Sequence, residues 1–320
     1  MIKGIHHVGL TVANAREAAR FYAEAASLKA LAVDAPILQL PVDQTAINIA
    51  GASLLRGANA YLRLLEPSTP VAARLDRRPV AEAGIVHVCL QSPSIENLYA
   101  KFEHAGATFH APPVDLGTGF LYSYARDKEN NVVELEGVPP VWEDNTPWVA
   151  HVSFSSANVD RLADFYAQVF GQIAIKSPHL GPSRRMDLVS GMQGTEFRAA
   201  WIPAGNMQVE VIQYFVPPTH VTNQTRSIGD IGYSYVCLEV DDMASSIAHL
   251  QSLGATQPDA LATMSDHNRY FCLDPDGNIL LLLCLSASEH EFAISELSDP
   301  MVVTRMATER DALLKRKKIA

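Results

Sequence analysis

Hydrophobic and polar residues alternate along residues 4–12, and this alternation predicts a β-strand at the start of the chain. Odd-numbered residues such as His7 fall on one face of the strand, so His6 is expected to point away from that face. Residues 15–26 are rich in Ala, Arg, Glu and aromatic residues, which favours a helix with Asn14 as its N-cap. The chain therefore opens with a strand that carries a histidine and leads directly into a helix.

The same unit returns later in the chain. Residues 151–166 repeat residues 7–22: each segment starts with His-Val, continues through Ala-Asn and ends with Phe-Tyr, at identical spacing. Two weaker copies open at His87 and Tyr235, in the related runs His-Val-Cys-Leu and Tyr-Val-Cys-Leu. The sequence thus predicts four units of strand, helix and three strands, at residues 4–67, 84–138, 148–216 and 231–286.

These units predict an α+β fold. One unit alone exposes the concave face of a short sheet, so the four βαβββ modules must form two pairs, each a half-open mixed β-barrel with its helices outside. We expect the pairs to follow chain order. This gives one domain at residues 1–138, a proline-rich linker at 139–147, a second domain at 148–286 and a partly helical tail at 287–320.

Composition narrows the class of function. The chain has 320 residues, 48% of them hydrophobic, which is enough for two ordinary cores, and its formal net charge of −10 argues against nucleic acid or an anionic membrane as a partner. No apolar run reaches the length of a membrane span, and the first strand leaves no room for a signal peptide. The four cysteines lack ligand spacing and suggest a reducing compartment. We expect a cytoplasmic homo-oligomer that acts on a small molecule.

Six short motifs recur in a fixed order, and together they resemble the vicinal oxygen chelate superfamily. That superfamily includes glyoxalase I, methylmalonyl-CoA epimerase, bleomycin-resistance proteins and the type I extradiol ring-cleaving dioxygenases. The resemblance spans about residues 1–286 and is specific for the fold rather than for the reaction. The motifs are His-Val-Gly-Leu at 7–10, His-Val-Cys-Leu at 87–90, Val-Val-Glu-Leu at 132–135, His-Val-Ser-Phe at 151–154, Val-Glu-Val-Ile at 209–212 and Asp-Pro-Asp-Gly-Asn at 274–278.

The resemblance implies that metal ligands come from the first and last strands of each module. In the expected N-terminal pair these places fall on His7, Arg63, His87 and Glu134, and in the C-terminal pair on His151, Glu210, Tyr235 and Leu281. Two imidazoles and one carboxylate suit a divalent metal: Fe(II) in the first place, with Mn, Ni, Co or Zn as alternatives. We therefore expect the metal to bind His7, His87 and Glu134, and we interpret His151 with Glu210 as an ion pair in a degenerate copy of the site.

Three other residues are candidates for substrate contacts. Arg63 cannot ligate a metal, so it either binds an anionic substrate group or forms a salt bridge with a nearby acid such as Glu134. Tyr124 lies ten residues before Glu134, and the resemblance to extradiol dioxygenases implies a catalytic contact for a tyrosine at that spacing. Tyr122 has the same strand parity and is a second candidate for binding the substrate.

Three functions remain open at this point. The first is an extradiol-type dioxygenase that cleaves a small, catechol-like and anionic aromatic, favoured by the two-His, one-Glu set and by Tyr124. The second is a metal-dependent lyase or isomerase of the glyoxalase or epimerase kind, in which a carboxylate moves a proton. The third is a small-molecule binding protein without a metal. The sequence favours an oxidoreductase of the dioxygenase kind as the first expectation.

Overall fold

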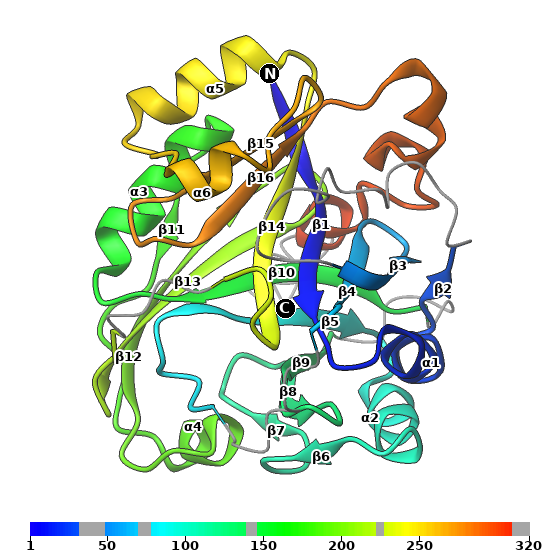
Figure 1. Cartoon of the computed structure of the whole chain (residues 1–320). Coiled ribbons are helices and arrows are strands. Elements are labelled where there is room, and N and C mark those ends of the chain that lie inside the picture. Colours follow the sequence, from blue (N-terminus) through cyan, green and yellow to red (C-terminus); the bar gives the residue numbers. More distant parts are fainter. Residues whose placement is uncertain (32–48, 70–77, 139–145, 222–226, 309–320) are drawn as a thin grey trace.

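The computed structural model describes residues 1–31, 49–69, 78–138, 146–221 and 227–308, and it contains two large mixed β-sheets (Figure 1). The sheet that we call the terminal sheet takes its strands from the two ends of the chain. Its order is β15 (Arg269–Leu273), β16 (Ile279–Leu283), β14 (Gly232–Val240), β1 (Ile2–Thr11), β4 (Tyr61–Pro67), β3 (Ile49–Arg56) and β2 (Lys29–Ala30).

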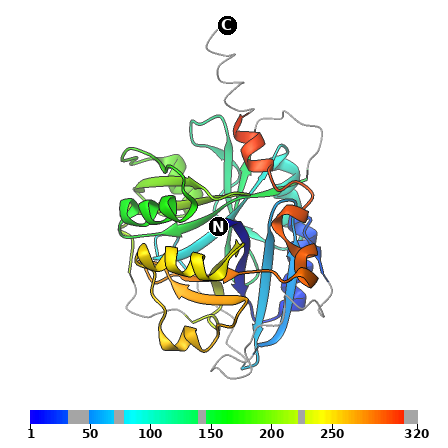
Figure 2. The same cartoon turned by 90° about the horizontal axis from the view of Figure 1, so that it is seen from above.

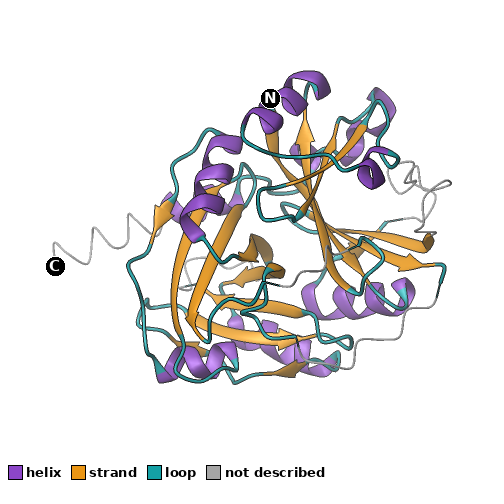
Figure 3. Cartoon of the chain, turned by 60° about the vertical axis from the view of Figure 1, so that its left-hand side comes forward, coloured by secondary structure: helices purple, strands orange, loops and turns teal. Residues whose placement is uncertain are grey.

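The sheet that we call the central sheet is built from the middle of the chain. Its order is β11 (Ile175–Lys176), β12 (Glu196–Pro203), β13 (Gln208–Val216), β10 (Trp148–Ser155), β5 (Gly84–Ser92), β9 (Val132–Gly137), β8 (Leu121–Arg126) and β6 (Thr108–Phe109), with β7 (Val114–Asp115) paired to β8. The α+β class and the two pairs of modules with open sheets are confirmed. Figure 3 shows the helices lying along the outside of the sheets.

The sheets group the modules differently from the expected chain order. β1 pairs antiparallel with β14, and β5 pairs antiparallel with β10, so the first module joins the fourth and the second joins the third. Figure 2 shows the blue start of the chain beside the yellow and orange segments. The four opening strands share one alternation of hydrophobic and polar residues, so either pairing buries the same faces, and the sequence does not distinguish between them.

Each long helix follows the opening strand of a module. These helices are α1 (Ala15–Ala26), α2 (Ile95–His104), α3 (Val159–Phe170) and α5 (Met243–Ser252), while α4 (Arg184–Ser190) and α6 (Asp259–Ala262) are short. The predicted N-cap is confirmed, because the Asn14 side chain accepts a hydrogen bond from the Glu17 amide at 2.9 Å. No helix among the described ranges is long and apolar enough to cross a membrane.

The repeated Phe-Tyr pair connects modules that follow one another in the chain. The Tyr22 hydroxyl donates to Asp127 at 2.8 Å, from the first module to the second, and Tyr166 donates to Asp274 at 2.9 Å, from the third to the fourth. Helix contacts therefore link the first module to the second and the third to the fourth, whereas strand pairing joins the first to the fourth and the second to the third. Most of the expected linker at 139–147 and the tail beyond residue 308 lie outside the described residues.

The tail starts with two 3-10 helices, η2 (Ala287–Phe292) and η3 (Ile294–Glu296). They lie against the terminal sheet: the Ile294 amide donates to Glu239 of β14 at 2.8 Å. Residues 302–308 are helical, and Val302 and Met306 pack against Trp148 of the central sheet. The described part of the tail thus contacts both sheets.

Two buried asparagines fasten the sheets to each other. Asn206, in the turn before β13, accepts from the Ile5 amide at 3.0 Å and donates to the Ile5 carbonyl at 2.9 Å, so it pairs with β1 of the other sheet. Asn59, in the matching turn before β4, makes the same pair of bonds with Val149 of β10, at 2.9 and 2.7 Å. Each side chain replaces a missing strand partner, because buried backbone groups need hydrogen bonds.

We expect Asn206→Ala to lower the free energy of unfolding by about 3–5 kcal/mol, since it leaves the buried amide and carbonyl of Ile5 and the carbonyl of Asn59 without this partner. Urea unfolding of the purified protein measures the change. Asn158→Ala, which removes only the exposed N-cap of α3, is the matched control and should cost about 1 kcal/mol. Equal effects of the two substitutions would contradict a fastening role for Asn206.

Candidate metal centre

Four buried side chains converge on the concave face of the central sheet. They are His87 on β5, Glu134 on β9, His151 on β10 and Glu210 on β13, and their ligand atoms all lie within 4.8 Å of one another. The His151 Nε2 atom lies 2.9 Å from Glu134 Oε2 and 3.4 Å from Glu210 Oε2, and His87 Nε2 lies 3.2 Å and 3.5 Å from the same two oxygens. The two imidazole Nε2 atoms are 3.3 Å apart.

Strand register explains the convergence. Cys89 lies opposite Glu134 on one side and opposite His151 on the other, and Ser153 lies in the same way between His87 and Glu210. Residues directly opposite each other on paired strands project to the same side of a sheet. The four long side chains therefore rise from two adjacent rows around the shorter Cys89 and Ser153.

Burial and mutual charge set the protonation of the four groups in the metal-free protein. Burial would raise the pKa of both carboxylates, but the two histidines outweigh it and hold the pKa of Glu134 and of Glu210 below the usual value. Burial would lower the pKa of the histidines, but the carboxylates outweigh it and raise the pKa of His87 and, further, of His151. Without a metal, the cluster stabilises itself by binding protons on its histidines.

The donor set fits a divalent metal ion. Two imidazole nitrogens and two carboxylate oxygens suit Zn, Ni, Co, Mn or Fe(II). The Glu210 Oε2 atom, which faces the two histidines, is buried and makes no hydrogen bond with any described residue. A cation at this point would satisfy that oxygen and compensate two carboxylates buried side by side.

The equivalent places in the terminal sheet carry a different set of residues: His7 on β1, Arg63 on β4, Tyr235 on β14 and Leu281 on β16. The His7 Nε2 atom is 2.9 Å from the Tyr235 hydroxyl, and Arg63 is buried with 1% of its surface exposed. A Cβ at Gly9 would lie 2.2 Å from the Tyr235 ring, so only glycine lets this ring lie across β1. Unlike the four donors of the central sheet, this set contains no carboxylate and includes a positively charged arginine, so it is not suited to bind a cation.

Comparisons with known proteins give the family. A sequence profile of the family described as "Glyoxalase/Bleomycin resistance protein/Dioxygenase superfamily" matches residues 4–135 and 148–282, which is most of the chain. The chain belongs to this superfamily. A search of curated proteins finds no match.

Solved structures support the fold. Glyoxalase I from Zea mays is 16% identical, over 88% of this chain and 92% of that chain, with a TM-score of 0.59. A point mutant of the same enzyme is 15% identical, over 91% and 95% of the two chains, with a TM-score of 0.61. A putative dioxygenase from Bacillus subtilis subsp. subtilis str. 168 is 10% identical, over 93% and 90%, with a TM-score of 0.56. At these identities the likeness concerns the fold alone.

The structure brings together only part of the metal set expected from the sequence. His87 and Glu134 lie in the central cluster, but His7 lies in the terminal sheet with Tyr235, and Arg63 lies there as well. His151, which the sequence suggested for an ion pair, stands at the place where His7 was expected. The physical reason is the pairing of the second module with the third.

Tyr124 and Tyr122 lie on β8 at the edge of the central cluster. Tyr124 is opposite Glu134, and its ring centroid is 5.1 Å from that of His87. Tyr122 is one row further from the cluster, and its hydroxyl is 3.0 Å from the Thr118 hydroxyl. Tyr124 is therefore the better placed of the two expected tyrosines for contact with a molecule at the cluster.

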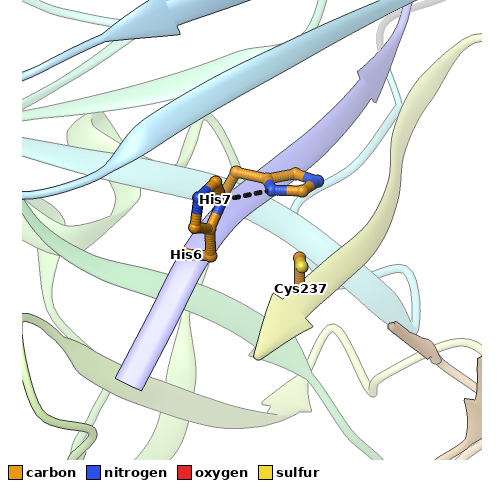
Figure 4. A group of neighbouring side chains, drawn as sticks. All are labelled: His6, His7 and Cys237. Carbon is orange, nitrogen blue, oxygen red and sulfur yellow. Dashed lines mark hydrogen bonds between the residues drawn. The ribbon is translucent and has the colours of Figure 1, made fainter. Parts of the chain in front are cut away.

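His6 does not face away from His7 as expected. The register of β1 shifts between Ile5 and His7, so a β-bulge at His6 turns its buried ring toward the concave side. Figure 4 shows the two rings joined through their Nδ1 atoms, at 2.7 Å, with Cys237 of β14 nearby. The Nε2 atom of His6 is 2.9 Å from the Phe292 carbonyl of η2, and its ring stacks on Tyr61.

Acid should weaken the fold through this pair. Burial lowers the pKa of His6 from 6.5 to about 4, so between these values only the unfolded chain takes up the proton and stability falls as the pH decreases. We expect His6 to contribute a loss of about 2 kcal/mol between pH 7 and pH 5, with buried His7 acting in the same direction. Urea unfolding at the two pH values measures it. His6→Gln should flatten the pH dependence, and His104→Asn on exposed α2 should not.

Proposed function

We propose that this protein is a divalent-metal-dependent isomerase or lyase acting on a small molecule with two adjacent oxygen atoms. The observation that carries the proposal is the set of four convergent donors, His87, Glu134, His151 and Glu210, on one concave face. The sequence alone had divided these four residues between two separate sites. The proposal moves the dioxygenase, the first expectation from the sequence, to second place.

The number of donors distinguishes the two reactions. Four protein donors would leave a six-coordinate metal two positions, which is enough for one bidentate substrate. Ring cleavage of a catechol with O2 needs three open positions, as provided by a set of two histidines and one carboxylate. The fourth donor, Glu210, therefore favours chemistry in which the substrate is the only ligand supplied from solution.

A carboxylate of the cluster moves the proton in this proposal. A bound divalent metal supplies Lewis acidity, which polarises a substrate carbonyl and acidifies the neighbouring C–H bond. Glu210 would accept that proton while the electron pair of the C–H bond shifts toward the carbonyl oxygen. It would then return the proton to the former carbonyl carbon, while the proton of the neighbouring substrate hydroxyl moves to the former carbonyl oxygen. Glu210 suits this role better than Glu134, because its carboxylate lies further from both histidines; with Oε2 facing the metal site, the second oxygen of this carboxylate would take the proton.

An extradiol dioxygenase remains a second candidate because of one observation. Tyr124 lies opposite Glu134 and beside His87, at the position where the sequence comparison implied a contact with a catechol oxygen. If Glu210 does not bind the metal, the remaining set is two histidines and one carboxylate. The choice therefore depends on whether Glu210 is a ligand.

Metal loading followed by two assays tests the proposal. Protein purified without metal is loaded separately with Fe(II), Mn(II), Co(II), Ni(II) and Zn(II) under argon, and bound metal is counted by elemental analysis. We expect about one ion per chain, and exchange of the α-proton of α-hydroxycarbonyl compounds in D2O by NMR. Oxygen uptake with catechols in the Fe(II) form would support the dioxygenase instead. Absence of binding for every metal would leave the metal-free binding protein.

A further inference from the structure

The Ser153 hydroxyl lies beside the cluster, and the proposed function gives it no role. Ser153 lies on β10, directly opposite His87 on β5 and opposite Glu210 on β13, and so projects from the same concave face. It is completely buried, and its Oγ atom has no hydrogen-bond partner among the residues that the structure describes. The hydroxyl therefore lies in the floor of the site, between two of the proposed ligands.

An unpartnered buried hydroxyl is costly, by about 1–3 kcal/mol, and calls for an explanation. Other buried serines of the central sheet have partners: Ser123 donates to the Ala111 carbonyl at 2.7 Å, and Ser155 lies 3.4 Å from the Thr219 hydroxyl. In the terminal sheet, the position equivalent to Ser153 is Gly9, which carries no polar group at all. Ser153 thus adds an unpartnered hydroxyl next to the complete donor set, whereas the unpartnered Tyr61 hydroxyl of the terminal sheet lies on β4, away from these donors.

The groups facing Ser153 suggest what its partner is. His87 and Glu210 flank it, and their Nε2 and Oε2 atoms are turned toward each other and toward His151. These two flanking atoms therefore do not serve as partners of Ser153, and a partner can enter with the occupant of the cluster. We propose that the Ser153 hydroxyl hydrogen-bonds to an oxygen atom of the molecule that occupies the metal site; this inference rests on the proposed function. The oxygen atom would belong to water in the resting protein and to the substrate in the complex. Ser153 then favours ligands that present an oxygen on the sheet side.

Stability and metal affinity together test this role, without any need for the substrate. In Ser153→Ala, the metal-free protein should unfold at the same temperature as the wild type or higher, because no hydrogen bond is lost. Its Kd for Co(II), followed by the visible absorption of the bound ion, should rise about 10-fold, the lower end of the effect of residues that support metal ligands. Ser153→Thr keeps the hydroxyl and should retain the wild-type Kd.

Ser155→Ala is the matched control, since it removes a partnered hydroxyl from the same strand and the same face. It should lower the unfolding temperature of the metal-free protein and leave the Kd for Co(II) unchanged. An unchanged Kd in Ser153→Ala, while the wild type binds Co(II), would overturn the role of Ser153 and leave the proposed metal site intact. Failure of the wild type to bind any metal ion would overturn both proposals.

Discussion

Replacing His151 with alanine should remove the metal from the protein, whereas replacing His7 with alanine should leave it bound. His151 supplies one of the four convergent donors of the central sheet, while His7 lies at the equivalent place in the terminal sheet beside Tyr235. Residues that only support metal ligands typically change affinity 10- to 100-fold, so loss of a ligand should weaken binding by about 100-fold or more. Titration with Co(II) or Zn(II), followed by elemental analysis after gel filtration, measures the affinity and the number of ions.

The two histidines are a closely matched pair. Each lies on the opening strand of its module and is at least 96% buried, so both substitutions remove the same side chain from equivalent positions in the fold. The expectation drawn from the sequence alone was the reverse, with His7 as a ligand and His151 dispensable. A protein that keeps its metal in His151→Ala and loses it in His7→Ala would restore that earlier assignment and remove the basis of the proposed function.

Glu210→Gln should reduce α-proton exchange by about 10²- to 10⁴-fold at saturating metal, the range expected for loss of a general base. Glutamine keeps an oxygen that can face the metal, but it cannot accept the proton. The measurement is the exchange rate in D2O at several metal concentrations, so that weaker metal binding is separated from the lost proton transfer. A drop that disappears at high metal concentration would assign Glu210 to metal binding alone.

Glu239→Gln provides the control for this substitution. Glu239 is a buried carboxylate in the terminal sheet, where it pairs with Lys3 and accepts a hydrogen bond from the Ile294 amide. The substitution should lower stability by weakening these contacts, and the exchange rate at saturating metal should stay close to that of the wild type. The comparison separates loss of the proton-accepting group from a general effect of removing a buried negative charge.

The sequence identified the parts of the molecule but not how they combine. The repeated runs around His7, His87, His151 and Tyr235 predicted the four modules and the α+β class, and every residue of the central cluster was already named as standing at a ligand place. The sequence divided these ligand positions wrongly between the two sites. The alternation of hydrophobic and polar residues along an opening strand is the same whichever module it pairs with. The packing of the two sheets likewise depends on contacts such as those of Asn59 and Asn206, which join residues far apart in the chain and leave no periodic signal.

The periodicity of the sequence also does not predict two local features. Strict alternation placed His6 on the outward face, but the bulge in β1 adds one residue to the strand and turns this side chain inward. By alternation, Ser153 falls on the same face of its strand as His151. Only the structure shows that its hydroxyl has no hydrogen-bond partner among the described residues. A sequence records which residues share a face of a strand, whereas the satisfaction of a buried polar atom depends on the whole neighbourhood.

The nested pairing of the modules has a consequence for the order of assembly during synthesis on the ribosome. The strands of the central sheet all lie between Gly84 and Val216, so this sheet and its four donors can form as soon as that stretch has emerged. The edge of β1 stays unpaired until β14, at Gly232–Val240, has been synthesised, which at ~5–20 residues per second takes roughly 10–45 s. During that interval β1 is an exposed strand edge of the kind that recruits other chains, and a nascent-chain chaperone should bind there.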